Sequence, residues 1–296
     1  MAEELVILSG KGGTGKTSIT ASFAVLAQMA VVADCDVDAA DLHLLLDPEV
    51  LRTEQFYSGH EAMIDRSVCQ QCGTCHAYCR FDAVRSELDA EGGVVYRVDR
   101  IACEGCGVCV RVCPTGAIKF PQSHCGQWMV SRTRCGPMVH ARLGVAAENS
   151  GKLVTIVRDQ ARRIANEQHH DLVIVDGPPG IGCPVIASLS GGSRVLVVTE
   201  PTVSGEHDLM RVLDLSRHFA IPTAVCVNKW DINPRMTQRI ERIARSNGCL
   251  LAGRIPYDLS VTEAQVRKLT VVEVESPAAD AVRSIWKQLR QPQFSC

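Results

Sequence analysis

The sequence shows no excess of basic charge, no long hydrophobic run and no sign of a secretory leader. Its 31 Lys and Arg residues are balanced by 33 Asp and Glu residues, for a net charge of -2, so we expect no nucleic-acid partner. No apolar stretch approaches the roughly 20 residues that span a bilayer, and membrane binding is not expected. The N-terminus lacks a basic segment followed by an apolar one. These absences predict a cytoplasmic protein.

Cysteine, in contrast, is abundant, with 15 residues among 296. In a small secreted protein such a number would favour disulfides, but in a reducing compartment it favours metal binding. Eight of the cysteines form two runs of identical spacing, at 69–79 and 103–113. Metal chemistry is therefore expected in the middle of the chain.

A phosphate-binding loop lies near the N-terminus. The residues from Gly10 to Thr17 spell GKGGTGKT, which matches G-x-x-x-x-G-K-[ST] between an apolar strand at 5–8 and a helix at 16–29. In this motif, backbone N–H groups and the helix N-terminus bind phosphates. Lys16 should contact the β- and γ-phosphates, and the Thr17 hydroxyl should bind Mg²⁺. The expected nucleotide-binding residues here are Gly12, Gly13, Thr14, Gly15, Lys16, Thr17 and Ser18.

Strands and helices alternate on both sides of the cysteine runs. This order predicts an α/β P-loop NTPase fold with a mostly parallel sheet flanked by helices. Between about 56 and 122, apolar runs become short and Cys, Gly and charged residues dominate. We therefore expect an ATPase domain at 1–58 and 123–296, interrupted by an inserted α+β bacterial-type two-cluster ferredoxin module at 59–122. Further strands are expected at 30–33, 171–176, 194–199, 223–228 and 250–255, and further helices at 150–168, 206–219, 236–246 and 278–289.

A second lysine in the loop, Lys11, gives the pattern K-G-G-x-G-K-T. This pattern resembles the deviant Walker A motif of the MinD/Mrp/ParA/nitrogenase-iron-protein superfamily. The resemblance implies ATP-dependent dimerisation, as a homodimer or as a heterodimer with a related ATPase, in which Lys11 reaches the partner's nucleotide as an arginine finger does. Within the superfamily, the chain resembles the MinD-type ATPases with an inserted ferredoxin domain over nearly its whole length.

The same resemblance assigns roles to four later positions. Asp36, the second Asp of D-C-D, matches the residue that handles the attacking water, and Asp176 matches the Walker B carboxylate that supports Mg²⁺ through water. Asn228 matches the base-contacting Asn, and Pro256 lies in an I-P-Y-D segment near the base. The residues N-K-W-D that end at Asp231 also fit the guanine-binding pattern N-K-x-D, so GTP is an alternative to ATP.

The two cysteine runs share the C-x2-C-x2-C-x3-C spacing of bacterial ferredoxins. In that motif the fourth cysteine of each run binds the cluster of the other run, so the spacing predicts two [4Fe-4S] clusters held by one interlocked module. Pro114 follows the second run as is usual, whereas Arg80 follows the first. Zinc is the alternative metal. The expected ligands are Cys69, Cys72, Cys75 and Cys113 for one cluster, and Cys103, Cys106, Cys109 and Cys79 for the other.

Cys183 ends the segment D-G-P-P-G-I-G-C, which corresponds to switch II in the resemblance above. A cysteine at this spacing in the nitrogenase iron protein binds a cluster that bridges two subunits, so the resemblance makes Cys183 a candidate ligand of a dimer-bridging cluster. Cys125 or Cys135 would then supply a second thiolate. The alternative is that Cys183 is a small hydrophobic residue in the core.

The last expected helix places Val282, Ile285 and Leu289 on one face. MinD proteins bind membranes through a basic amphipathic tail of this kind. Because this helix has a single aromatic residue and is not strongly basic, we expect its apolar face to pack in the core instead.

Three functions are compatible with these features. The first is an iron–sulfur ATPase that couples ATP binding, hydrolysis and dimer closure to electron transfer, through two [4Fe-4S] clusters, to an unknown redox or metalloprotein partner. The second is an Mrp-like ATPase that assembles or carries iron–sulfur or metal clusters, although the C-terminal C-x-x-C of such scaffolds is missing here. The third is a MinD/ParA-like positioning ATPase.

Overall fold

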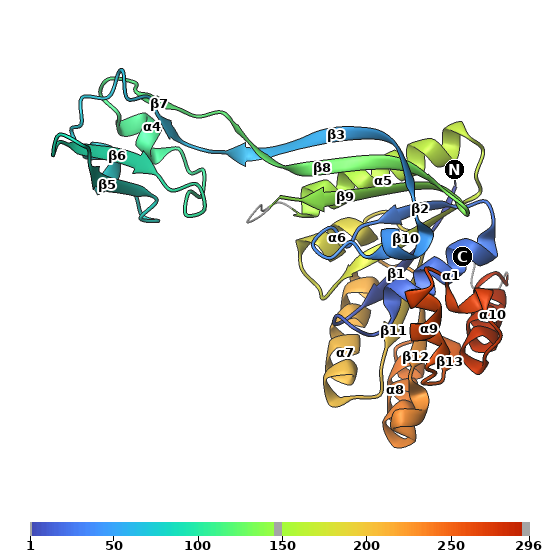
Figure 1. Ribbon diagram of the computed structural model, residues 1–296. Coiled ribbons are helices and arrows are strands. Elements are labelled where there is room, and N and C mark those ends of the chain that lie inside the picture. Colours follow the sequence, from blue (N-terminus) through green and yellow to red (C-terminus); the bar gives the residue numbers. More distant parts are fainter. Residues whose placement is uncertain (1, 145–149, 292–296) are drawn as a thin grey trace. The chain divides into compact units, whose positions relative to one another are not determined.

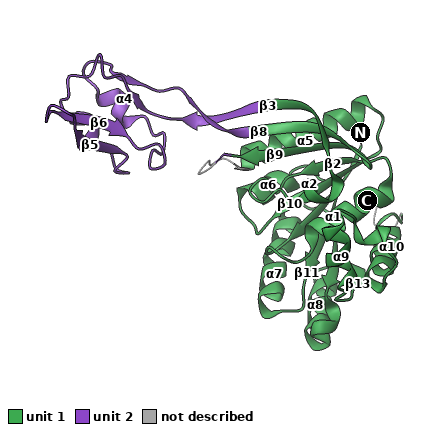
Figure 2. Ribbon diagram, in the orientation of Figure 1, with its two compact units in different colours: residues 1–54, 127–143, 150–296 green, residues 55–126, 144–149 purple. Residues whose placement is uncertain are grey.

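The computed structural model describes residues 2–144 and 150–291 (Figure 1). The chain divides into two compact units (Figure 2). Unit 1 comprises Met1–Glu54, Gln127–Leu143 and Ser150–Cys296, and unit 2 comprises Gln55–Gly126 and Gly144–Asn149. Unit 2 thus contains both cysteine runs. None of the helices in the described ranges combines the length and the apolar character that crossing a membrane requires.

A nine-stranded sheet forms the centre of unit 1, in the order β13-β12-β11-β1-β10-β2-β9-β8-β3 among the described residues. The strands from β13 to β9 pair in parallel, so the predicted α/β fold with a mostly parallel sheet is confirmed. Strands buried on both faces are continuous apolar runs, which is why the sequence located them. The strands are β1 (Glu3–Ser9), β2 (Val31–Asp34), β3 (Glu49–His60), β8 (Gln122–Thr133), β9 (Gly136–Leu143), β10 (Leu172–Pro179), β11 (Arg194–Thr199), β12 (Thr223–Asn228) and β13 (Leu250–Ile255).

Helices pack against this sheet and close its core. Leu5 and Ile7 of β1 pack in one cluster with Phe23 of the first helix and Ile285 of the last. Val282 and Leu289 belong to the same cluster, so the prediction that the last helix packs in the core is confirmed. The helices of unit 1 are α1 (Lys16–Ala27), α2 (Leu42–Leu46), α5 (Ser150–Glu167), α6 (Cys183–Leu189), α7 (Val203–His218), α8 (Pro234–Ser246), α9 (Ser260–Val266) and α10 (Pro277–Leu289), with short 3-10 turns η1 (Trp230–Ile232) and η2 (Val271–Glu273).

In the described part of unit 1, three strands and three helices were not predicted from the sequence. Strands β3, β8 and β9 extend the sheet beyond β2. In β3 the residues at 49–53 are all exposed, so the strand has no alternation of apolar and polar residues to reveal it. The strand expected at 171–176 continues as β10 to Pro179, and α6 starts at Cys183. Helices α2 and α9 were also missed, because five to seven residues carry too little helical periodicity.

Unit 2 combines two small hairpins with two short helices. In each run the second cysteine is followed by a glycine, Gly73 or Gly107, and the helix begins at the next residue. Gly73 has φ 73°, and a Cβ there would lie 2.7 Å from the Tyr96 hydroxyl, so only glycine fits. That residues 59–122 form a ferredoxin module stays a prediction. The elements are β4 (Met63–Ile64) paired with β7 (Ile118–Lys119), β5 (Val84–Leu88) paired with β6 (Val94–Val98), α3 (Thr74–Ala77) and α4 (Val108–Val112).

Candidate functional site

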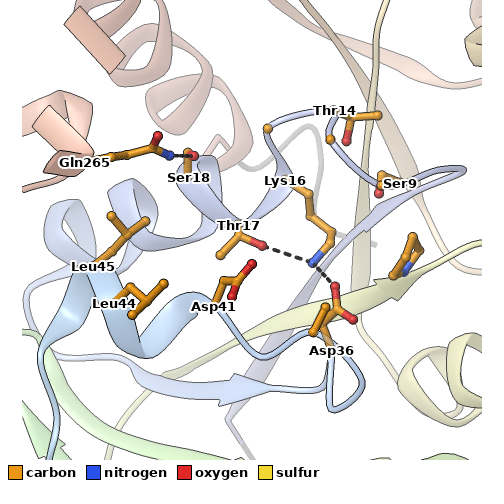
Figure 3. Close-up of a pocket in the computed structure, with 15 residues that line it drawn as sticks. Ser9, Thr14, Lys16, Thr17, Ser18, Asp36, Asp41, Leu44, Leu45 and Gln265 are labelled. Atoms are coloured by element: carbon orange, nitrogen blue, oxygen red, sulfur yellow. Dashed lines mark hydrogen bonds and ion pairs between the residues drawn. The ribbon is translucent and has the colours of Figure 1, made fainter. Parts of the chain in front are cut away.

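A cavity of about 530 Å³ lies over the phosphate-binding loop, at the carboxyl ends of β1 and β2 (Figure 3). Its volume is in the range typical of small-molecule sites. Helix α1 starts at Lys16 immediately after Gly15, whose φ of 87° suits glycine. A Cβ at Gly15 would lie 2.4 Å from Nδ2 of Asn228, so a larger residue would displace the loop. The cavity is lined by Ser9, Gly12, Gly13, Thr14, Gly15, Lys16, Thr17, Ser18, Asp36, Ala39, Asp41, Leu44, Leu45, Pro179 and Gln265.

Lys16 connects the loop to two carboxylates. Its Nζ lies 2.9 Å from Oδ1 of Asp176 and 3.4 Å from Oδ2 of Asp36, and the side chain is only 6% exposed. Burial alone would lower the pKa of Lys16, but Asp176 and Asp36 outweigh it and raise the pKa. Lys16 is therefore held as a cation at the floor of the cavity, where phosphate would compete for it.

Asp176 also receives two hydroxyl groups from α1. Thr17 Oγ1 donates to its Oδ2 over 2.9 Å, and Thr20 Oγ1 donates to its Oδ1 over 2.7 Å. The register of β10 against β2 sets Asp176 beside Asp34. The structure thus brings together Lys16, Thr17, Asp36 and Asp176, which lie far apart in the sequence.

The oxygen-rich part of this cluster suits Mg²⁺, which prefers hard oxygen ligands. Burial and the nearby Asp176 raise the pKa of Asp34 well above its usual value, and its Oδ2 has no hydrogen-bond partner among the described residues. Burial likewise raises the pKa of Asp36. The Lys16 ammonium offsets the repulsion among these carboxylates, and the Thr17 hydroxyl is the ligand that the loop would supply to Mg²⁺.

Lys11 lies outside this cluster and is bound elsewhere. Its Nζ lies 2.5 Å from Oε1 of Glu200 and donates to Ser204 Oγ over 3.0 Å and to Thr202 Oγ1 over 3.3 Å. Burial alone would raise the pKa of Glu200, but the hydrogen bond and charge of Lys11 lower it overall. Glu200 could not be identified from the sequence alone, because its partner Lys11 is almost 190 positions away. We call Glu200, Thr202 and Ser204 the Lys11 cradle.

Residues of the N-K-W-D run form hydrogen bonds with the phosphate loop and with the I-P-Y-D segment. Asn228 donates from Nδ2 to the Thr14 carbonyl over 2.8 Å, and Lys229 donates to the Gly13 carbonyl over 3.2 Å. Asp231 accepts from the backbone N–H of Tyr257 over 2.7 Å. Neither Asn228 nor Pro256 is among the described residues that line the cavity. Base contacts by these two residues stay predictions.

Gln265 of α9 is a cavity residue that the sequence did not indicate. Its Nε2 donates to Ser18 Oγ over 2.6 Å across the cavity from the loop (Figure 3). Leu44 and Leu45 of α2 form an apolar wall of the same cavity. A nucleoside attached to phosphates on the loop would extend past Ser18 toward Gln265. The nearby I-P-Y-D segment suggested that this part of the chain approaches the nucleotide, but it did not point to Gln265.

Replacing Gln265 by Ala should weaken ATP binding about three- to tenfold, the usual effect of one lost hydrogen bond. Titration with a fluorescent ATP analogue measures this. Gln238→Ala, at an exposed position of α8, is the matched control and should bind as the wild type does. Unchanged affinity in Gln265→Ala would mean that the nucleoside lies elsewhere in the cavity.

The eight cysteines of the two runs gather in unit 2 around two cavities. Each cavity takes three cysteines from one run and the fourth from the other. No group of three or more His, Cys, Asp or Glu side chains in the described ranges is arranged to hold a metal ion. Each cavity is lined by four thiols, the donor set that a [4Fe-4S] cluster takes, and cluster binding stays a prediction. The first quartet is Cys69, Cys72, Cys75 and Cys113, and the second quartet is Cys79, Cys103, Cys106 and Cys109.

The other candidate cysteines do not come together in the same way. Cys183 is exposed at the start of α6, whereas Cys135 packs with Leu42 and Met138 in the core of unit 1. Cys125 is buried in unit 2, where its Sγ donates to the Ser58 carbonyl. Cys125 and Cys135 are both buried, and a role for either as a second thiolate stays a prediction. Cys183 as a bridging ligand stays a prediction.

Known proteins match this chain across the residues of both units. A family model described as the CobQ/CobB/MinD/ParA nucleotide binding domain matches residues 5–271. An uncharacterised protein of Methanocaldococcus jannaschii is 31% identical over 292 residues, which cover 97% of this chain and 96% of that protein.

Solved structures with the same fold include two MinD proteins. The septum site-determining protein MinD of Pyrococcus horikoshii, in complex with Mg-ADP, has a TM-score of 0.59 at 16% identity, covering 99% of this chain and 98% of its own. A chain of the MinC:MinD cell division complex of Aquifex aeolicus has a TM-score of 0.55 at 20% identity, covering 97% and 96%. At these identities, the likeness concerns the fold.

Proposed function

We propose that this chain, which belongs to the CobQ/CobB/MinD/ParA nucleotide-binding family, is an ATP-hydrolysing switch that self-associates when ATP is bound. The observation that carries the proposal is the cluster of Lys16, Thr17, Asp36 and Asp176 at the floor of the cavity. ATP is favoured over GTP because the related MinD structure holds Mg-ADP. Of the three functions compatible with the sequence, the comparisons favour the MinD/ParA-like ATPase over iron–sulfur electron transfer.

The residues of the cavity have separable tasks in this proposal. Incoming phosphates take over Lys16 from Asp36 and Asp176, because a multiply charged phosphate attracts the ammonium more strongly than one carboxylate does. Mg²⁺ held by Thr17 and supported by Asp176 would neutralise phosphate charge. Asp36, freed from Lys16, can orient a water molecule, and the burial that raises its pKa favours acceptance of a proton from that water.

Self-association follows from the position of Lys11. The resemblance to deviant Walker A proteins implies that this lysine acts on the nucleotide of a partner. Lys11 does not line its own cavity in the described structure, and its ammonium is occupied by the Lys11 cradle. Release from the cradle would let it cross a two-fold interface, so that each site is completed by the other subunit. The MinC:MinD complex supports the idea of a further protein partner.

Light scattering after size exclusion tests this proposal directly. The wild-type chain should double its mass when a non-hydrolysable ATP analogue and Mg²⁺ are added. Lys16→Ala should fail to bind the analogue and keep the single-chain mass. A wild-type chain that binds the analogue and keeps the single-chain mass would contradict the proposal.

A second function, electron transfer through unit 2, is supported by a different observation. Unit 2 has two cavities, and each is lined by four thiols in the combination that bacterial ferredoxin spacing predicts. We propose that each quartet holds one [4Fe-4S] cluster, whose chemistry when bound is one-electron transfer. Measurement of iron and inorganic sulfide in anaerobically purified protein tests it. Protein that folds and contains zinc instead of iron would contradict it.

A further inference from the structure

We propose that the two cysteine quartets differ in reduction potential, and that Thr74 and Thr115 raise the potential at the first quartet. The inference rests on the proposed binding of [4Fe-4S] clusters by unit 2. It goes beyond that binding by specifying which quartet receives an electron first and which side chains decide this.

The two runs can be compared position by position because their spacing is identical. Two residues after the second cysteine, the first run has Thr74 and the second run has Val108. Two residues after the fourth cysteine, the first run has Phe81 and the second run has Thr115. Since the fourth cysteines are exchanged between quartets, both threonines fall at the first quartet.

The cavity linings reflect this exchange. Thr74 and Thr115 line the cavity of the first quartet together with Gln70 and Tyr96. At the matched positions, Val108 and Phe81 line the cavity of the second quartet, whose other lining residues are mainly apolar. The first cavity is therefore rich in hydroxyl groups and the second is not. The apolar residues lining the second are Ala62, Phe81, Ala83, Val84, Val98, Val108 and Phe120.

Both threonine hydroxyls are within reach of a cysteine sulfur. Thr74 Oγ1 lies 3.3 Å from Cys72 Sγ, and Thr115 Oγ1 lies 3.7 Å from Cys113 Sγ. In the part of unit 2 that the structure describes, no side-chain hydroxyl makes such a contact with a sulfur of the second quartet. The two quartets each have one exposed cysteine, Cys72 or Cys106, and only the first has a buried one, Cys75.

Hydrogen bonds to sulfur raise the reduction potential of a thiolate-bound cluster. Reduction adds one electron and thus one negative charge to the group that the thiolates hold. A hydroxyl donor stabilises that added charge, whereas an apolar wall offers it no compensation. With two donors at one quartet and none at the other, a single electron supplied to unit 2 should reside at the first quartet.

A redox titration followed by electron paramagnetic resonance tests this on the iron-loaded full chain, with dithionite as the one-electron donor. The wild type should be reduced in two resolved steps. Replacing both threonines by Val should lower the higher step so that the preference for the first quartet falls at least tenfold, which for one electron is 59 mV. Val108→Thr should raise the lower step. Val94→Thr, an exposed change on β6 away from both cavities, should move neither.

Three outcomes would overturn the inference. They are coincident steps in the wild type, threonine variants that leave both steps in place, and variants that move the lower step instead of the higher one. Should the Val variants lose iron, Thr74→Ser and Thr115→Ser retain the hydroxyl and must reproduce the wild-type steps, while Val108→Thr still tests the effect at the second quartet. Absence of iron from the wild type would instead refute cluster binding itself.

Discussion

Replacing Lys11 by Ala should yield a protein that binds ATP as the wild type does but neither dimerises nor hydrolyses ATP at an appreciable rate. Cations supplied in trans to a transferred phosphoryl group contribute about 10³-fold or more to the rate, so a loss of at least that size is expected. ATP affinity should be kept because the lysine in the cavity is Lys16, whereas Lys11 is bound by the Lys11 cradle. Fluorescent-nucleotide titration, light scattering and phosphate release measure the three properties.

The controls for this prediction separate the two lysines of the loop. Lys16→Ala should lose binding and hydrolysis together, since its ammonium lies at the floor of the cavity. Lys287→Ala, exposed on α10, should behave as the wild type does. If Lys11→Ala weakens ATP binding as strongly as Lys16→Ala does, Lys11 acts within its own subunit and the trans role is wrong.

The geometry of the Lys11 cradle explains why dimerisation should depend on ATP. An ammonium group has three N–H donors, and Lys11 has three acceptors in Glu200, Thr202 and Ser204. A lysine with all donors satisfied has no reason to leave for water. The phosphates of a nucleotide in a partner subunit carry more charge than Glu200 and would compete with the cradle for it. In the proposed switch, the resting monomer and the closed dimer would be two alternative sets of contacts for one side chain.

The sequence predicted the central sheet and the phosphate loop well because both depend on local patterns. Strands β11, β12 and β13 were located to the residue, since each is an apolar run between turn signals. Strands β3, β8 and β9 were missed because polar or mixed residues form them at the end of the sheet, where pairing with a neighbour, rather than burial on both faces, defines the strand.

Residues whose role depends on distant contacts could not be found in this way. Glu200 and Gln265 contact Lys11 and Ser18, which are about 190 and 250 positions away in the chain. No periodicity or motif connects such pairs. The cysteines are the opposite case, because a fixed spacing of thiols already specifies which three lie on one loop. Even so, the difference between the linings of the two cavities required the structure.

Replacing Cys113 by Ser should remove the [4Fe-4S] cluster proposed at the first quartet, although Cys113 belongs to the second run. Iron should fall from about eight to about four atoms per chain, because each four-iron cluster needs four thiolates and Cys113 lines the same cavity as Cys69, Cys72 and Cys75. A cluster held within each run would instead predict that Cys113 serves with Cys103, Cys106 and Cys109. Single variants halve the iron under either arrangement, so they do not separate the two.

Double variants do separate them. Cys72→Ser with Cys113→Ser removes two residues of one quartet from different runs and should keep about four iron atoms per chain. Cys106→Ser with Cys113→Ser removes two residues of one run from different quartets and should keep almost none. Cys125→Ser, a buried cysteine of the same unit outside both quartets, should keep the wild-type content. The reverse pattern for the two double variants would mean that each run binds its own cluster, and the exchange of fourth cysteines, on which the unequal environments of Thr74 and Thr115 depend, would be wrong.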